Sequence, residues 1–195
     1  QTVIAIGGDN SITFSVASAL FPDLSKVGLV TLDAHHDLRD GMSNGSPVWR
    51  LIQAGLPGKN IVQIGISDFA NSHEYTERAK EQGIYIITRD QLRRQSMKDS
   101  MKEAFSVLNR RVDEIYVDLD VDVCDRSVAP ACPASVPGGI SADELRQAAF
   151  YSGANSKVRA IDITEIDAKK DAADQRTIRL AALLVLEFAA GVATR

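Results

Sequence analysis

Three carboxylates and two histidines lie within eight residues of this sequence, in the segment Asp33-Ala34-His35-His36-Asp37-Leu38-Arg39-Asp40. An apolar run typical of a buried strand, residues 27–32, comes directly before it. If the backbone stays extended past that strand, residues 33, 35 and 37 project to one side. A carboxylate, an imidazole and a second carboxylate around one point suit Mn²⁺, Fe²⁺ or Zn²⁺. The alternative is a solvated acidic turn.

A second acidic segment, Asp118-Leu119-Asp120-Val121-Asp122-Val123-Cys124-Asp125, continues the apolar run 114–119. Its alternate aspartates share one face of the strand, where burial would be costly unless cations compensate the charge. An exposed edge strand with a polar face is the alternative. Together the two segments predict a two-metal centre, in which a bridging water ionised near neutral pH acts as the nucleophile of a hydrolysis.

Two shorter segments follow other apolar runs. Ile163-Thr164-Glu165-Ile166-Asp167 could present Glu165 to a cationic amidine or guanidine group, although an ordinary glutamate at a strand end would look the same. Gly7-Gly8-Asp9-Asn10-Ser11 stands where a phosphate loop would stand but lacks its glycine spacing and lysine. Its glycines are therefore expected to let the turn approach the site closely.

The elements that must position these residues alternate along the chain. Short apolar runs rich in β-formers alternate with amphipathic helical stretches, which predicts an α/β fold of three layers (αβα) around a mostly parallel sheet. The strands are predicted at residues 3–6, 27–32, 61–66, 84–87, 114–119 and 158–163, and the helices at 11–20, 47–54, 72–82, 97–109, 141–152 and 175–190. Two long loops, 33–46 and 120–140, each follow a strand, where ligands bind in parallel sheets.

Composition narrows the class of protein. The 195 residues are expected to form one domain over residues 1–195, because a chain of this length can bury roughly 70% of its unfolded surface. The net charge is −4 and the basic residues come in scattered pairs, which argues against nucleic-acid binding. No apolar run approaches the 18 or so residues of a membrane span. The two cysteines are too few for a disulfide framework, so we expect reduced thiols and a cytoplasmic location.

Four motifs resemble the signatures of the ureohydrolases, the arginase and agmatinase family, in order and spacing. They are GGDNS at 7–11, DAHHD at 33–37, DLDVDVCD at 118–125 and ITEID at 163–167. The resemblance implies an arginase-like fold, of which this chain would hold the C-terminal two thirds, with the N-terminal part missing. The segments DAHHDLR, Asn44-Gly45-Ser46-Pro47 and 61–72 look most like the formimidoylglutamase branch, which hydrolyses N-formimino-L-glutamate to L-glutamate and formamide in histidine degradation.

The resemblance also implies roles for individual residues. Two Mn²⁺ ions per subunit would be bound by Asp33, His35, Asp37, Asp120 and Asp122, with Asp33 and Asp120 bridging them. A metal-bridging hydroxide would attack the C=N carbon, and Glu165 would contact the formimino nitrogens. Catalytic roles therefore fall to Asp33, Asp120 and Glu165.

Several positions depart from the family pattern. Asn10 stands where most members have a histidine ligand, and an amide is the weaker ligand, so one metal is expected to be loosely held. Asn44, expected to bind substrate, replaces a histidine thought to shuttle protons. His36 either fills that role or packs beside the ligands. Arg39 and Arg50 flank the loop above the metals and could pair with substrate carboxylates, unless they are ordinary surface arginines.

Two other functions fit the same sequence. One is an agmatinase or guanidino-acid hydrolase that releases urea. The other is a non-catalytic binding or regulatory homologue, which the two asparagines would suit. The family resemblance further implies a homo-oligomer, a trimer or a hexamer, acting on a small-molecule substrate.

Overall fold

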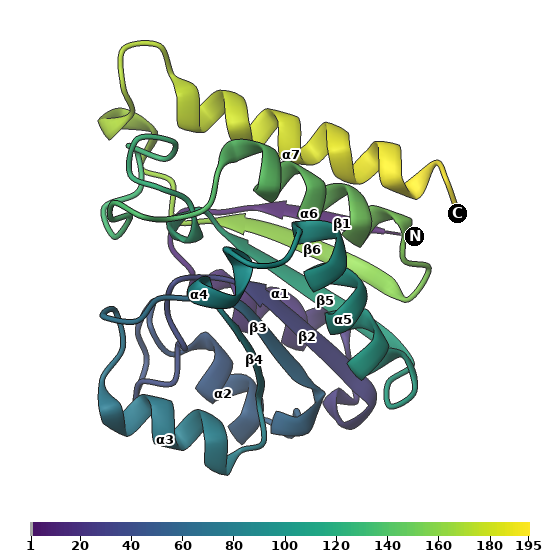
Figure 1. Cartoon of the computed structure of the whole chain (residues 1–195). Helices are drawn as coiled ribbons and strands as arrows, with labels where there is room; N and C mark the ends of the chain where they lie inside the picture. Colours follow the sequence, from purple (N-terminus) through teal and green to yellow (C-terminus); the bar gives the residue numbers. More distant parts are fainter. Residues whose placement is uncertain (1) are drawn as a thin grey trace.

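Six parallel strands form a single sheet in the computed structural model, which describes residues 2–195 (Figure 1). Their order in the sheet is β1-β6-β5-β2-β3-β4, and every neighbouring pair is parallel. The strands are β1 (Val3–Ile6), β2 (Val27–Leu32), β3 (Ile61–Ile66), β4 (Tyr85–Thr88), β5 (Glu114–Asp120) and β6 (Val158–Thr164). The carboxyl ends of β2 and β5, which precede the two acidic segments, therefore lie side by side.

Helices cover both faces of the sheet and complete three layers (Figure 1). One hydrophobic cluster joins the sheet to α1 (Ile12–Leu20), α2 (Pro47–Gln53) and α3 (His73–Glu81). The other joins it to α5 (Met97–Asn109), α6 (Ala142–Ala154) and α7 (Arg176–Val192). Alternate residues of one strand serve the two clusters: Val117 and Leu119 of β5 face α5 to α7, whereas Tyr116 faces α1 to α3. The predicted three-layer α/β fold is confirmed.

Local signals place the helix ends. Serines at 72, 96 and 141 cap α3, α5 and α6, and each accepts a hydrogen bond from a backbone N–H of the first turn. At α6, Ser141 and Glu144 form the reciprocal pair of a capping box. The sequence did not predict the short helix α4 (Arg89–Leu92), whose four residues give no helical period to detect.

A row of buried polar side chains crosses the sheet on the face covered by α1 to α3. Gln63 pairs in register with Thr31, Thr31 with Asp118, and Asp118 with Asp162, so the row spans four adjacent strands. All four side chains are fully buried. The row lies just below the carboxyl edge of the sheet, where the acidic segments begin.

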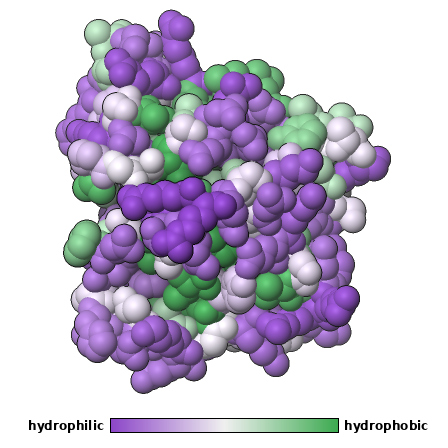
Figure 2. All heavy atoms as spheres, viewed as in Figure 1, coloured by the Kyte–Doolittle hydropathy of each residue, from purple (hydrophilic) through white to green (hydrophobic). Residues whose placement is uncertain are grey.

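Hydrophilic residues predominate on the face of the molecule shown in Figure 2, and hydrophobic residues reach the surface in separate patches. Among residues 2–195, none of the helices combines the length and the hydropathy that a membrane crossing needs. The large apolar side chains left exposed include Ile6 on the edge strand β1 and Leu186 on α7.

Candidate metal centre

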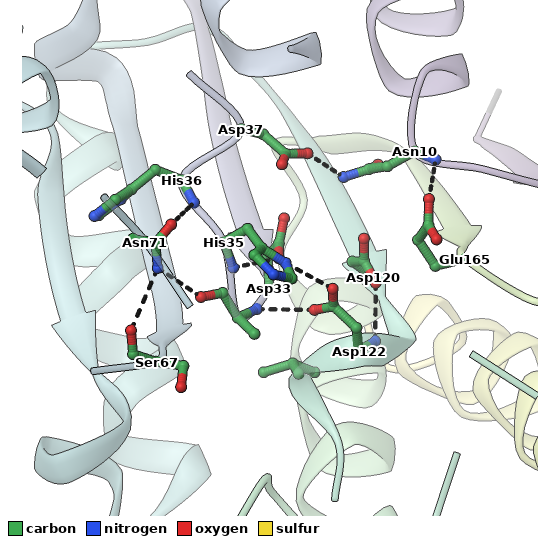
Figure 3. Close-up of polar contacts among 12 residues, drawn as sticks. Asn10, Asp33, His35, His36, Asp37, Ser67, Asn71, Asp120, Asp122 and Glu165 are labelled. Carbon is green, nitrogen blue, oxygen red and sulfur yellow. Dashed lines mark hydrogen bonds and ion pairs between the residues drawn. The ribbon is translucent and has the colours of Figure 1, made fainter. Parts of the chain in front are cut away.

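The loop after β2 and the turn after β5 meet at the carboxyl edge of the sheet (Figure 3). His35 Nδ1 lies 2.7 Å from Asp122 Oδ2, and the backbone N–H of Ala34 donates to Asp122 Oδ1 at 3.0 Å. Asp33 Oδ1 accepts the backbone N–H of His35 at 2.6 Å. Residues of the two acidic segments, nearly ninety positions apart in the chain, thus form one cluster.

The turn that carries Asp120 and Asp122 is short and closely packed. Asp120 Oδ1 accepts the backbone N–H of Asp122 at 2.8 Å, which caps a single 3₁₀ turn, Val121–Val123. Gly65, in an irregularity of β3, has a φ of +96°, and a Cβ there would lie 2.4 Å from the Val123 side chain. The absence of a side chain at Gly65 lets this turn sit against β3 beside Asp33.

Burial sets the electrostatics of this cluster. Burial, and then the charge of Asp122, raise the pKa of Asp33 and of Asp120 well above the usual range. Burial and the same neighbour raise the pKa of Asp37 to about 7. For Asp122, burial acts in the same direction, but the hydrogen bond and charge of His35 outweigh it and lower its pKa. The protein therefore gathers more negative charge here than its own donors neutralise.

This donor set fits divalent cations. Asp33 Oδ2 is buried and receives no hydrogen bond from the described residues, which is costly for a carboxylate without a counter-ion. Two sets of three ligand atoms lie within 4.8 Å of one another: Asp33, His35 and Asp122 in one, and Asp120, Asp122 and Cys132 in the other. Carboxylate oxygens and an imidazole at such spacing suit Mn²⁺ or a similar ion.

Asn10 lies at the edge of the cluster, with its amide already engaged. Its Nδ2 donates to Asp37 Oδ2 at 2.7 Å, and its Oδ1 lies 2.7 Å from the hydroxyl of Thr13 and 3.2 Å from that of Thr164. In this orientation Asn10 serves Asp37 rather than presenting a free oxygen to an ion. Asp37 itself has a positive φ of 53°, a conformation that non-glycine residues adopt mostly at constrained sites.

A cavity of about 90 Å³ opens above the cluster, lined by His35, Asp37, Arg39, Asn44, Gly45, Asp120, Asp122, Ala134 and Glu165. Glu165 Oε1 accepts the backbone N–H of Asn10 at 3.0 Å and Asn44 Nδ2 at 3.3 Å. Glu165 also has a positive φ, 63°, at the end of β6. The structure thus brings Glu165, Asn44 and Arg39 to the mouth of the cluster.

Arg50 lies elsewhere. Its guanidinium stacks on the ring of Phe14 in α1, 3.7 Å from the ring centroid, and it does not line the cavity. Its side chain ties α2 to α1 in this structure.

A larger cavity of about 600 Å³ lies between α5 and α6, near the amino ends of the strands. Its lining includes Lys102, Arg110 and Tyr151 but no carboxylate or histidine. The acidic cluster, rather than the larger space, is therefore the candidate site.

Four residues near the site have positions that the motifs do not reveal. The ring of His36 points away from Asp33 and His35, and Asn71 contacts the backbone of the same loop (Figure 3). The His36 ring contacts Gln63 of β3. Cys132 is buried beside Asp120 and Asp122. A polar residue within the apolar strand 61–66 was the only sequence signal for Gln63.

Comparison with protein families gives one match over almost the whole chain: the family model described as Arginase family matches residues 1–191. Among curated proteins, formimidoylglutamase of Halalkalibacterium halodurans is 39% identical over 193 residues. That alignment covers 96% of this chain and 60% of the relative, so the chain spans about 60% of the relative's length.

Solved structures give the same fold. The crystal structure of formimidoylglutamase from Bacillus subtilis has a TM-score of 0.91 and 36% identity, covering 96% of this chain and 60% of that one. Formiminoglutamase of Trypanosoma cruzi, crystallised with Mn²⁺, has a TM-score of 0.88 at 24% identity, covering 98% of this chain and 65% of that one.

Proposed function

Because this chain belongs to the arginase family, we propose that it performs metal-dependent hydrolysis of N-formimino-L-glutamate to L-glutamate and formamide. The observation that carries this proposal is the cluster of the buried Asp33, Asp37, Asp120 and Asp122 with the half-buried His35, beneath a cavity that is also lined by Arg39 and Glu165. The identity of 39% and 36% to two proteins named formimidoylglutamase supports this branch of the family over others.

The ions would be held by the carboxylates and the imidazole of this cluster. Mn²⁺ is the ion named for the T. cruzi formiminoglutamase structure, and it suits the oxygen-rich donor set here. Bound divalent cations would lower the pKa of a water molecule, which supplies the nucleophile at neutral pH, and would also polarise the amidine. Because the Asn10 oxygen already lies within hydrogen-bond distance of two hydroxyls, we propose that the ion nearest Asn10 and Asp37 is the weaker one.

Glu165 would orient the formimino group. Both of its hydrogen bonds in the site reach Oε1, which leaves Oε2 to accept an N–H of the substrate. A formimino group carries positive charge when protonated, so a carboxylate beside it favours binding with the C=N carbon held over the cluster. Asn44 holds the same carboxylate at 3.3 Å and so fixes its orientation.

Arg39 would bind the acidic end of the substrate. Its side chain lines the cavity, and its backbone N–H donates to Gly45 O at 3.0 Å, which closes the loop around the opening. A guanidinium pairs with carboxylates through two parallel hydrogen bonds, whereas it would repel the cationic tail of agmatine. Arg50, which stacks on Phe14, is not part of this proposal.

The test is a product assay. The chain loaded with Mn²⁺ is incubated with N-formimino-L-glutamate, and formamide is measured beside an Asp120→Asn control. We expect formamide from the wild type and at most about 1% of that rate from the variant, since it removes a carboxylate from the proposed centre. Release of urea from a guanidino substrate, with no formamide, would favour the agmatinase alternative. No product, together with no bound manganese, would favour a non-catalytic homologue.

We also infer a homo-oligomer in the cytoplasm. The oligomer follows from the family resemblance, and both cysteines are free and buried, as expected of a protein from a reducing compartment. Sedimentation velocity of the chain tests the first inference: a single species at the mass of a monomer would contradict it.

A further inference from the structure

Alternate residues of the ligand loop face in opposite directions. His35 and Asp37 line the cavity and Asp33 lies in the cluster, whereas the carbonyl oxygen of Ala34 and the backbone of His36 face β3 and the loop after it. The contacts with Asn71 of that loop are drawn in Figure 3. The side that faces away from the cluster is therefore held by residues outside the four motifs.

Gln63 of β3 forms two hydrogen bonds with His36. Gln63 Nε2 donates to the carbonyl oxygen of His36 at 3.0 Å, and Gln63 Oε1 lies 2.7 Å from His36 Nδ1. Because a carbonyl can only accept, the amide nitrogen of Gln63 must point to it, and the amide oxygen must then face the ring. His36 Nδ1 therefore carries a hydrogen and donates it to Gln63, so Nδ1 offers no lone pair to an ion.

Asn71, in the loop after β3, forms hydrogen bonds with the backbone of Ala34 and His36. Its Oδ1 accepts the backbone N–H of His36 at 2.9 Å, and its Nδ2 donates to Ala34 O at 2.9 Å and to Ser67 O at 3.3 Å. One side chain thus joins two backbone groups of the ligand loop to its own loop.

We propose that His36, Gln63 and Asn71 form a clamp that positions the metal-ligand loop, and that the second histidine of DAHHD is a positioning residue and not a ligand. The clamp fixes the backbone on both sides of His35, which sets the direction in which Asp33, His35 and Asp37 project. Its effect on metal binding rests on the proposed function, whereas its effect on the loop does not.

Gln63 belongs to the buried polar row of the sheet, which explains how the clamp is held rigid. The side chain is fully buried and pairs in register with Thr31 of β2, two residues before Asp33. A polar side chain in this position requires partners, and the two atoms of His36 supply them. Outer partners of metal ligands typically change affinity by about 10- to 100-fold when they are removed.

The first measurement is hydrogen exchange of residues 33–38 in the metal-free chain. Gln63→Met keeps the length and removes both hydrogen bonds, and Asn71→Ala removes three. Each is expected to raise the exchange rate of this segment by about tenfold or more, because the His36 N–H loses its partner or its support. Unchanged exchange in both variants would overturn the clamp.

The second measurement is Mn²⁺ affinity, from the electron paramagnetic resonance of the free ion. We expect affinity about 10- to 100-fold weaker for Gln63→Met, Asn71→Ala and His36→Leu. His36→Asn can place an N–H near the position of Nδ1 and is expected to keep affinity within about threefold of wild type. If His36→Asn loses as much affinity as His36→Leu, the ring itself binds the ion and the positioning role is overturned.

Asn60→Ala is the matched control. Asn60 is as buried as His36, and its Nδ2 also donates to a backbone carbonyl, that of Ser25 at 3.3 Å, but it lies at the amino end of β3. It should lower stability and leave both measurements unchanged. A wild-type chain that binds no Mn²⁺ would refute the proposed function, while hydrogen exchange would still decide the clamp.

Discussion

At Asp162, two hydroxyls lie within hydrogen-bond distance of one oxygen of a fully buried carboxylate, and the single hydrogen of the Thr13 hydroxyl is shared between this oxygen and Asn10 Oδ1. Tyr116 and Thr13 each lie 2.7 Å from its Oδ2, while Oδ1 has no donor among the described residues. Burial raises the pKa of Asp162 to about 6 in spite of these hydrogen bonds. Asp162 is therefore a buried acid that costs stability whenever it must be charged.

The pH dependence follows from the sign of this shift. An aspartate in the unfolded chain has a pKa of about 3.9, so between about pH 4 and pH 6 the folded state binds the extra proton. The contribution of Asp162 to the free energy of unfolding is thus greatest below pH 4 and is lost as the pH rises through 6. The free energy of unfolding of Asp162→Asn, relative to that of the wild type, should therefore rise by on the order of 2 kcal/mol from pH 4 to pH 7.

Urea unfolding of both proteins in the presence of a chelator, at several pH values, measures this difference. The difference reports Asp162 together with its neighbour Asp118, because the charge of Asp162 raises the pKa of Asp118. If the difference in free energy of unfolding between wild type and variant stays constant with pH, Asp162 does not take up the proton.

The motifs predicted which carboxylates would converge, and the structure brings Asp33, His35 and Asp122 within ligand distance of one another. Gln63 and Asn71 escaped prediction because, apart from the His36 ring, their partners in the loop are backbone groups 27 to 37 positions away. A contact with a backbone atom leaves no requirement on the partner's residue type, so the sequence carries no pattern for it. Arg50 was predicted to lie above the metals but stacks on Phe14 instead. That contact depends on how α1 and α2 pack, which the sequence pattern does not reveal.

At the scale of elements, the strands were predictable because both faces of the sheet are covered. A doubly covered strand is a predominantly apolar run, and the predicted bounds 3–6, 27–32 and 61–66 agree with β1, β2 and β3. The ends of β5 and β6 extend one residue beyond the prediction, to Asp120 and Thr164. Asp120 and Thr164 are polar, so their composition predicts a loop, yet they remain paired in the sheet beside the site.

Gly65 links the irregularity in β3 to the turn after β5. Gly65→Ala would place a methyl group 2.4 Å from the Val123 side chain, at a φ that L-residues rarely adopt. We expect a loss of roughly 2–4 kcal/mol of unfolding free energy and weaker metal binding, because the turn carrying Asp122 must shift.

Gly83→Ala separates the effect of backbone strain at a positive φ from the effect of the contact with Val123. Gly83 also has a positive φ, 72°, but a Cβ there would meet nothing within 4 Å. Urea unfolding should show a loss of about 1 kcal/mol, with unchanged Mn²⁺ affinity. Equal losses in the two variants would mean that backbone strain alone explains Gly65, and that the contact with Val123 does not matter.

At the scale of the whole molecule, the site concentrates charge that the fold alone does not compensate. Asp33, Asp37, Asp120 and Asp122 are buried at one edge of a sheet whose other buried positions are mostly apolar. A protein can keep such a cluster because a ligand that binds only the folded state adds its binding energy to the stability. The metal centre is thus expected to be a stabilising element as well as a catalytic one.

Thermal unfolding with and without Mn²⁺ tests this coupling. At a free ion concentration of about a thousand times the dissociation constant, the gain is about 4 kcal/mol, or roughly 10 °C in Tm for a chain of this size. The gain should be larger at pH 8 than at pH 6, because burial and Asp122 raise the pKa of Asp37 to about 7 and the ion must displace any proton there. Asp120→Asn should lose most of the gain at both pH values. A gain that grows as the pH falls would contradict the assignment of these carboxylates as ligands.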